Sequence, residues 1–188
     1  MKKNITCMFV AIATIALFPF GQSIAQNAGK SKIYTIEEII EKAPSLVGQT
    51  VQIEGVAQHV CATSGRKLFL ATPDGKRTFR VNAGKNITKF DKNVLKQNVI
   101  ATGVVFESRT TMEALNKQEA AAIAAEKAQA KPEHCSSEAK AQGEDIKETA
   151  VQRVQTLKAK LQEQINKGGK DYLSFYSMNN CNEYTISK

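Results

Sequence analysis

Both histidines of this chain lie next to a cysteine in the sequence. His59 is separated from Cys61 by one residue, and His134 directly precedes Cys135. Two imidazoles and two thiolates would suit a tetrahedral zinc site, and the same ligands could serve copper(I) or haem. The spacing is not that of the common zinc motifs. The alternative is that Cys61 is a small buried apolar residue, His59 a surface residue of a strand and His134 a polar residue at a helix end.

A second group of residues could bind an anion. Between Arg66 and Lys96 the sequence holds nine basic residues and only two acidic ones, in a chain whose formal net charge is +8. A local positive surface attracts anions, and a lipid head group, a glycan or an acidic protein would fit. The predicted anion-binding residues are Arg66, Lys67, Lys76, Arg77, Arg80 and Lys85. A solvated face that maintains solubility explains the same charges equally well.

The cysteines have a competing use, because thiols tend to pair in oxidising compartments. Cys61, Cys135 and Cys181 allow three single pairings, each of which leaves one thiol over. A bridge between Cys135 and Cys181 would close a loop of about 45 residues and add about 3–4 kcal/mol of stability in the chain-entropy model. We also expect Cys61 to be buried, since its strand lies near the predicted core.

Residues 1–25 have the pattern of an export signal. Lys2 and Lys3 precede an apolar run at residues 7–18, and small residues lead up to a cleavage site after Ala25. The run is too short to span a membrane, which takes about 20 apolar residues, and no second run of that length follows. We therefore expect a periplasmic or secreted protein without a membrane span.

Residues 26–109 should form most of a small β-barrel that carries the candidate residues. Apolar and polar residues alternate in four predicted strands, at 51–61, 67–71, 77–82 and 98–107. Gly55 and Gly103 interrupt the two long strands, which is typical of bulges or sharp coiling in small barrels. A short helix should come first, capped by Thr35 with Glu38 and ended by Pro44.

The two glycine-interrupted strands are alike in sequence. Residues 47–56 (VGQTVQIEGV) are echoed by residues 98–105 (NVIATGVV). In these glycines and β-branched residues the chain resembles the exported, largely uncharacterised OB-fold proteins grouped as tRNA-anti-like. The resemblance covers about residues 46–109. It implies a five-stranded Greek-key barrel whose second and third strands form the binding face, and it implies no catalytic residues.

Residues 110–170 are predicted to form a helical hairpin inserted into the barrel. An alanine-rich segment follows a capping box of Thr110 and Glu113 and favours a helix. The second helix should begin near Ser136 and end at the glycine pair that starts with Gly168. Its apolar stripe consists of Ile146, Ala150, Val154, Leu157, Leu161 and Ile165.

Residues 171–188 should complete the barrel. Strands are predicted at 172–178 and 181–186, joined by a tight turn at Asn179 and Asn180. The predicted fold class is therefore α+β, a five-stranded OB-fold β-barrel with a two-helix hairpin insertion before the C-terminal strands. A separate helical module with its own terminal hairpin is the alternative.

The sequence lacks the motifs of the common enzyme classes. It contains no G-x-S-x-G, H-E-x-x-H or C-x-x-C motif and no phosphate-binding glycine loop. Aromatic side chains for stacking on bases are also scarce, because tryptophan is absent and Phe69, Phe79 and Phe106 fit the predicted core. These observations speak against an enzyme and against nucleic-acid binding.

We therefore expect a non-enzymatic binding module for an anionic ligand or protein partner, with no cofactor. The first alternative is a protein that handles zinc, copper or haem through His59, Cys61, His134 and Cys135. The second is a structural or assembly protein, because the apolar stripe of the second helix could also pack on another copy. The oligomeric state and the identity of the ligand stay open.

Overall fold

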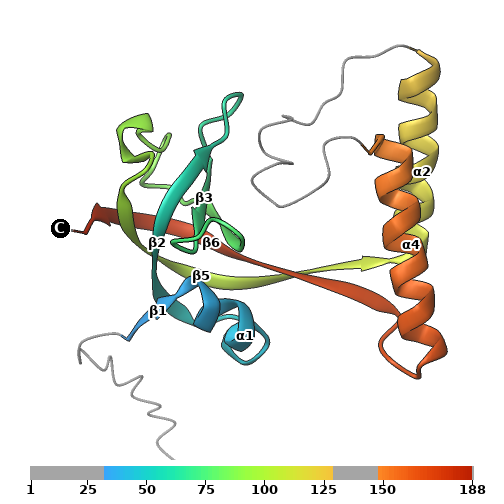
Figure 1. The fold of residues 1–188 in the computed structure, drawn as a ribbon, viewed down its shortest axis with the longest axis horizontal. Coiled ribbons are helices and arrows are strands. Elements are labelled where there is room, and N and C mark those ends of the chain that lie inside the picture. The colour runs from blue at the N-terminus through green and yellow to red at the C-terminus, as the bar shows by residue number, and fades with distance from the viewer. Residues whose placement is uncertain (1–31, 129–147, 188) are drawn as a thin grey trace, which may run out of the picture.

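The computed structural model describes residues 32–128 and 148–187. Figure 1 shows a β-barrel from which two strands extend to one side and carry a pair of helices. The predicted fold class is confirmed: the protein is α+β, with a closed five-stranded OB-fold barrel and a two-helix hairpin inserted before the last strand.

The order of the strands defines the barrel. They are β2 (Thr50–Val60), β3 (Lys67–Ala71), β4 (Thr78–Ala83), β5 (Asn98–Thr111) and β6 (Tyr172–Ile186). Their neighbours run β2-β3-β4-β6-β5, and β5 closes the barrel on β2. Only β4 and β6 pair in parallel within the barrel. A short strand, β1 (Ile33–Thr35), adds to β2 in parallel.

The side chains that fill the barrel core determine which of their neighbours on the same strand face outward. Leu68 and Leu70 of β3 lie opposite Val81 and Phe79 of β4, and all four belong to the buried core. Because neighbouring side chains of a strand point to opposite faces, the residues between them lie on the outer face. The core also receives apolar residues from α1 (Ile36–Leu46) and from the segment between β4 and β5, which contains the 3₁₀ turn η1 (Lys92–Val94).

The helix α1 is longer than predicted. Its Thr35–Glu38 capping box is confirmed, with the Glu38 backbone N–H donating to Thr35 Oγ1 over 3.2 Å. Pro44 does not end it, since the helix continues to Leu46. Proline so near the end removes only one intrahelical hydrogen bond. Leu46 stabilises the last turn because it is buried against the core.

The bulge predicted at Gly55 lies elsewhere in β2. The register of β2 against β3 shifts between Ala57 and His59. Gly55 is needed for close packing instead, because a Cβ atom there would lie 2.7 Å from Ile36 Cγ1 and 3.0 Å from the Ala71 carbonyl oxygen. A bulge and a close contact are both local reasons for a glycine within a strand, but only the fold shows which of them applies at Gly55.

The prediction of two C-terminal strands around a tight turn is wrong. Residues 172–186 form one strand, β6, which continues through Asn180. It pairs with β5 on both sides of this point, at Val104↔Asn179 and Thr102↔Glu183, and touches β4 between them. The Asn-Asn pair marks a bulge in the pairing with β5, and Asn180 takes the left-handed conformation with a φ of 52°.

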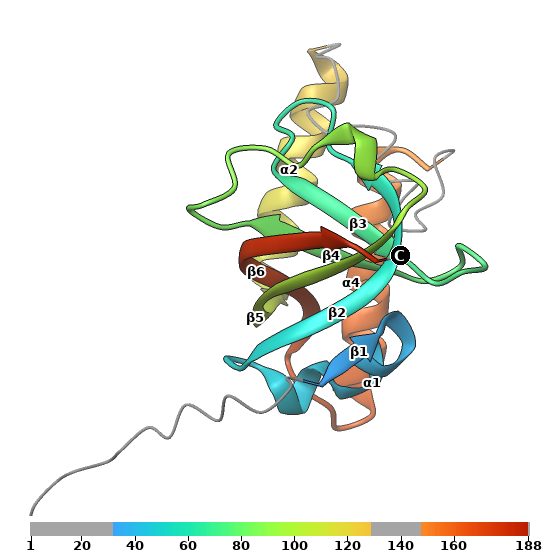
Figure 2. The same ribbon diagram turned by 90° about the vertical axis from the view of Figure 1, so that its left-hand side faces the viewer.

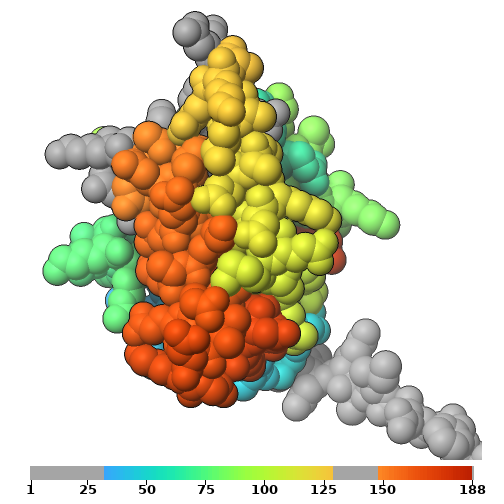
Figure 3. Space-filling view, turned by 90° about the vertical axis from the view of Figure 1, so that its right-hand side faces the viewer, coloured from blue at the N-terminus to red at the C-terminus, as the bar shows by residue number. Residues whose placement is uncertain are grey.

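Beyond the barrel, β5 and β6 continue as a two-stranded arm. The arm runs from the pair Phe106↔Ser177 to the pair Thr111↔Tyr172. It carries α2 (Met112–Lys127) and α4 (Ala150–Asn166), which lie side by side at this end of the molecule (Figure 3). They enclose a second, smaller core of Leu115, Val154 and Leu161, against which Leu173 of the arm also packs.

The ends of the two helices differ from the sequence prediction. α2 is capped by Thr111 rather than Thr110, because β5 extends one residue further than the capping pattern implies. The helix start expected near Ser136 lies outside the described residues, and α4 begins at Ala150, since Thr149 is extended and forms a capping box with Gln152. Ile146 lies outside the described residues. The predicted end of α4 is confirmed, with Gly168 in the left-handed conformation.

No helix within residues 32–128 and 148–187 combines the length and hydropathy that crossing a membrane requires.

The arm holds a polar cluster around Glu107, whose side chain is only 10% exposed. Ser174 Oγ donates to Glu107 Oε1 over 2.7 Å, and Arg109 Nη2 lies 2.7 Å from Oε2. The Ser174 hydrogen bond first, and Arg109 next, hold the pKa of Glu107 below its usual 4.5. The folded state therefore binds the Glu107 proton less readily than the unfolded state does.

We expect the stabilisation from Glu107 to be complete above its unfolded pKa and to be lost as the pH falls through its lower folded pKa. Glu107→Gln should therefore unfold more easily than the wild type at about pH 7 but nearly equally at about pH 2. Urea unfolding followed by circular dichroism at both pH values measures this. Glu113→Gln on α2 is the exposed control. A Glu107→Gln deficit that does not depend on pH would contradict the prediction.

Candidate functional site

The outer face of β3 and β4 is the candidate binding surface. OB-fold proteins bind ligands on this face of their second and third strands. The register places His59 of β2, Phe69 of β3 and Arg80 of β4 in one row, and Lys67 beside Asn82 in the next. All five alternate with core residues and point away from the barrel interior, although Phe69 is itself fully buried.

The connections around this face are also those of OB-fold sites. The loops between the first and second and between the fourth and fifth strands usually flank the ligand. Here the first is the short segment 61–66, and the second contains α2 and α4. The helical hairpin thus takes the place of the second of these loops in the chain order. Figure 2 shows the barrel strands in front of the helices.

Arg80 has an unused donor. The residue is half-buried, and its Nε atom is buried without a hydrogen-bond partner among the described residues. Phe69, its neighbour on β3, is fully buried and lies against His59, with ring centroids 5.7 Å apart. On the other side, Asn82 Nδ2 donates to Asn179 Oδ1 of β6 over 2.6 Å. The face therefore presents one guanidinium between an aromatic pair and an amide pair.

Arg66 serves the fold. Its Nη1 donates to the carbonyl oxygens of Ile87 and Thr88 over 3.1 and 3.2 Å. Its Nη2 donates to those of Ala83 and Gly84 over 3.0 and 3.1 Å. These bonds tie the start of β3 to the end of β4 and the segment after it. The Nη donors of Arg66 are therefore engaged within the fold, and the binding of an anion by this exposed residue stays a prediction.

The other predicted basic residues are spread over the barrel. Lys67 is half-buried at the start of β3. Lys76 and Arg77 lie in the exposed turn between β3 and β4, where Lys76 Nζ is 3.6 Å from Asp74 Oδ2. Lys85 follows β4 and lines a separate pocket. The structure thus brings only Arg80 and Lys67 onto the shared outer face.

The predicted metal ligands are tested only in part. Cys61 is 5% exposed, which confirms its predicted burial, and His59 is half-buried beside Phe69. His134 and Cys135 lie outside the described residues, so the four-ligand site stays a prediction. Within the described ranges, no group of three or more His, Cys, Asp and Glu side chains could hold a metal ion.

Cys181 is a free thiol in this structure, and its predicted partner Cys135 lies outside the described residues. It is fully buried and donates to the carbonyl oxygen of Glu183 over 3.3 Å. Burial raises its pKa to about 11, so the unreactive thiol form dominates at neutral pH. Cys181 therefore behaves as a core residue.

The expected burial of the aromatic residues holds for Phe69 and Phe79 but not for Phe106. Phe106 is 46% exposed, because β5 has left the barrel at this point. Phe175 of β6 is 43% exposed on the same face of the arm. The sequence predicts that the whole long strand belongs to the barrel, and only the pairing beyond Val105 shows that the strand leaves it.

Comparison with models of known protein families and with curated proteins finds no match to this chain. Its function must be inferred from the geometry of the site. Sequence reasoning selected Arg80 but missed Asn82, two residues along β4, and its hydrogen-bond partner Asn179 on the neighbouring strand β6. The Asn179-Asn180 pair was a visible signal, but the pattern was interpreted as a turn.

Proposed function

We propose that this protein is a non-enzymatic OB-fold module that binds an anionic ligand or partner on the outer face of β3 and β4. The observation that carries the proposal is the buried Nε of Arg80, which has no hydrogen-bond partner among the described residues. The tRNA-anti-like resemblance and the export signal are expectations from the sequence, and with them we expect the module to act in the periplasm or outside the cell.

The chemistry of Arg80 favours an anion. A buried N–H without an acceptor costs free energy, about 1–3 kcal/mol, until an acceptor reaches it. A carboxylate, sulfate or phosphate oxygen would satisfy it with a charge-assisted hydrogen bond. Because Arg80 is partly buried, salt screens its charge less than it screens the charges of the exposed lysines. Arg80 should therefore contribute more to binding than its single charge suggests.

Arg80→Gln should weaken binding to anionic probes about tenfold, since a hydrogen bond to a charged group is worth about 1.5–3 kcal/mol. The matched control is Arg77→Gln, which removes the same charge from the exposed turn of the same hairpin. It should change the affinity less than about twofold. Affinity is measured on immobilised heparin and on vesicles of anionic and of neutral lipid, at low salt.

Three results would contradict the proposal. Equal losses in both variants would mean that only net charge matters. Equal binding to neutral and anionic vesicles would remove the role of charge. Absence of any wild-type binding to either anionic probe would remove the function itself. Circular dichroism on both variants confirms that they are folded, because glutamine keeps much of the arginine side chain's volume and polarity.

A further inference from the structure

A polar pocket lies at the bulge of β6, where its pairing with β5 is interrupted and β4 lies along its other edge. The pairing of β5 with β6 is interrupted between Thr102↔Glu183 and Val104↔Asn179, so three residues of β6 lie opposite Gly103 alone. The pocket encloses about 450 Å³. That is within the usual range for small-molecule sites, about 300–1,000 Å³. It is distinct from the Arg80 face, since Arg80 does not line it.

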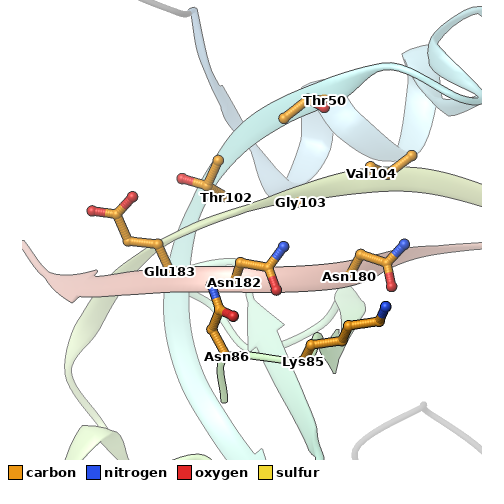
Figure 4. Close-up of a pocket in the computed structure, with 9 residues that line it drawn as sticks. All are labelled: Thr50, Lys85, Asn86, Thr102, Gly103, Val104, Asn180, Asn182 and Glu183. Atoms are coloured by element: carbon orange, nitrogen blue, oxygen red, sulfur yellow. The ribbon is translucent and has the colours of Figure 1, made fainter.

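The pocket wall is rich in unused hydrogen-bonding groups. Asn180 and Asn182 of β6 and Asn86 of the segment after β4 line it (Figure 4). None of these three carboxamides forms a hydrogen bond to a described residue. Each carboxamide offers two donors and an acceptor. The pocket can therefore bond both the N–H and the C=O groups of a ligand.

Opposite charges lie at the two ends of this wall. Figure 4 shows Glu183 at one end of the row and Lys85 at the other, with Asn182 between them. Neither charge forms an ion pair within the described part of the chain. Lys85 can therefore bind a carboxylate and Glu183 an ammonium group.

A backbone hydrogen bond joins the two walls of the pocket beside Asn182. Gly84 N donates to the Cys181 carbonyl oxygen over 2.6 Å, which joins the segment after β4 to the bulge. A Cβ atom on Gly84 would overlap Asn182 Oδ1 and lie 2.9 Å from the same carbonyl oxygen. The close contact at Gly84 thus holds the two walls of the pocket together.

We propose that this pocket binds a small zwitterionic ligand of the amino-acid or dipeptide class. Lys85 takes the carboxylate, Glu183 takes the ammonium group, and the three asparagine amides bond the peptide group between them. A neutral sugar fits less well, because no aromatic ring lines the pocket to stack on it. A simple anion fits less well, because Glu183 would repel it.

Diglycine is the test ligand. Titrating it into the ¹⁵N-labelled full chain, up to about 10 mM, should shift the side-chain amide signals of Asn86, Asn180 and Asn182. Lys85→Gln and Glu183→Gln should each weaken the fitted affinity about tenfold, as expected for one charged hydrogen bond. The control is Lys89→Gln, which lies on the same segment but outside the pocket and should bind as the wild type does.

A blocked peptide separates the classes of ligand. N-acetyl-glycine N-methylamide has the peptide group but neither charge, so it should bind at least about tenfold more weakly than diglycine. Equal binding of the two, or equal binding of glucose, would overturn the zwitterion. Absence of shifts in the asparagine amides with every compound would overturn the site. The binding of heparin to Arg80 is measured separately, so either proposal can fail alone.

Discussion

Arg66→Lys should lower the free energy of unfolding by about 2–3 kcal/mol, although the charge is unchanged. The guanidinium donates to four carbonyl oxygens spread over residues 83–88. A lysine ammonium has three donors at one point and cannot reach all four oxygens at once. Fewer hydrogen bonds would then hold the segment after β4, which places buried apolar residues such as Ile87 and Phe90 in the core.

Urea unfolding at neutral pH measures the loss, and Arg77→Lys is the control, because Arg77 lies in an exposed turn. The control should stay within about 0.5 kcal/mol of the wild type. If Arg66→Lys were equally stable, Arg66 would be available to a ligand and our assignment of it to the fold would be wrong. Heparin affinity of the folded variant then distinguishes the two roles, because a ligand contact would weaken it.

Gly103→Ala should destabilise the barrel by about 2–3 kcal/mol, because the new methyl group has no space. Its Cβ would lie 2.6 Å from Met178 Cγ and 2.8 Å from the Asn179 carbonyl oxygen. Met178 is fully buried, and the carbonyl belongs to the backbone, so neither atom can move away cheaply. The position of Gly103 in the middle of a strand marked it as unusual, but the sequence did not indicate that the neighbouring strand β6 lies so close to it.

The matched control for Gly103→Ala is Gly168→Ala, at which a Cβ atom would meet nothing within 4 Å. Gly168 is left-handed with a φ of 75°, so alanine there should cost only about 1–2 kcal/mol of backbone strain. Thermal and urea unfolding of both variants compare the two effects. A smaller loss for Gly103→Ala than for Gly168→Ala would show that Met178 can repack.

Local patterns predicted the elements that depend on neighbours in sequence. Alternation identified the strands β3 and β4, and the cap of α1 at Thr35 follows from four consecutive residues. The stripe through Val154 and Leu161 identified the buried side of α4. In each case the periodicity of the element itself contains the information.

The sequence predictions failed where contacts between strands far apart in the chain determine the local structure. Asn179 and Asn180 have the composition of a turn, yet β6 continues through them because it has β5 on one side and β4 on the other. The four carbonyl oxygens bonded by Arg66 were likewise not visible in the sequence, and the role of Arg66 as a ligand-binding residue stays a prediction. No window of sequence contains both partners of such a contact.

The arm has a consequence for how the chain folds. Closing the barrel requires β5 and β6, far apart in sequence, to find each other, and such long closures are slow. The paired helices α2 and α4 shorten the search, because their packing brings Thr111 and Tyr172, the outermost pair of the arm, together. Pairing of β5 with β6 can then proceed from this end toward the barrel, one residue at a time, until Ile186 pairs with Val99. The helical hairpin at the end of the arm thus provides the starting point from which the barrel closes.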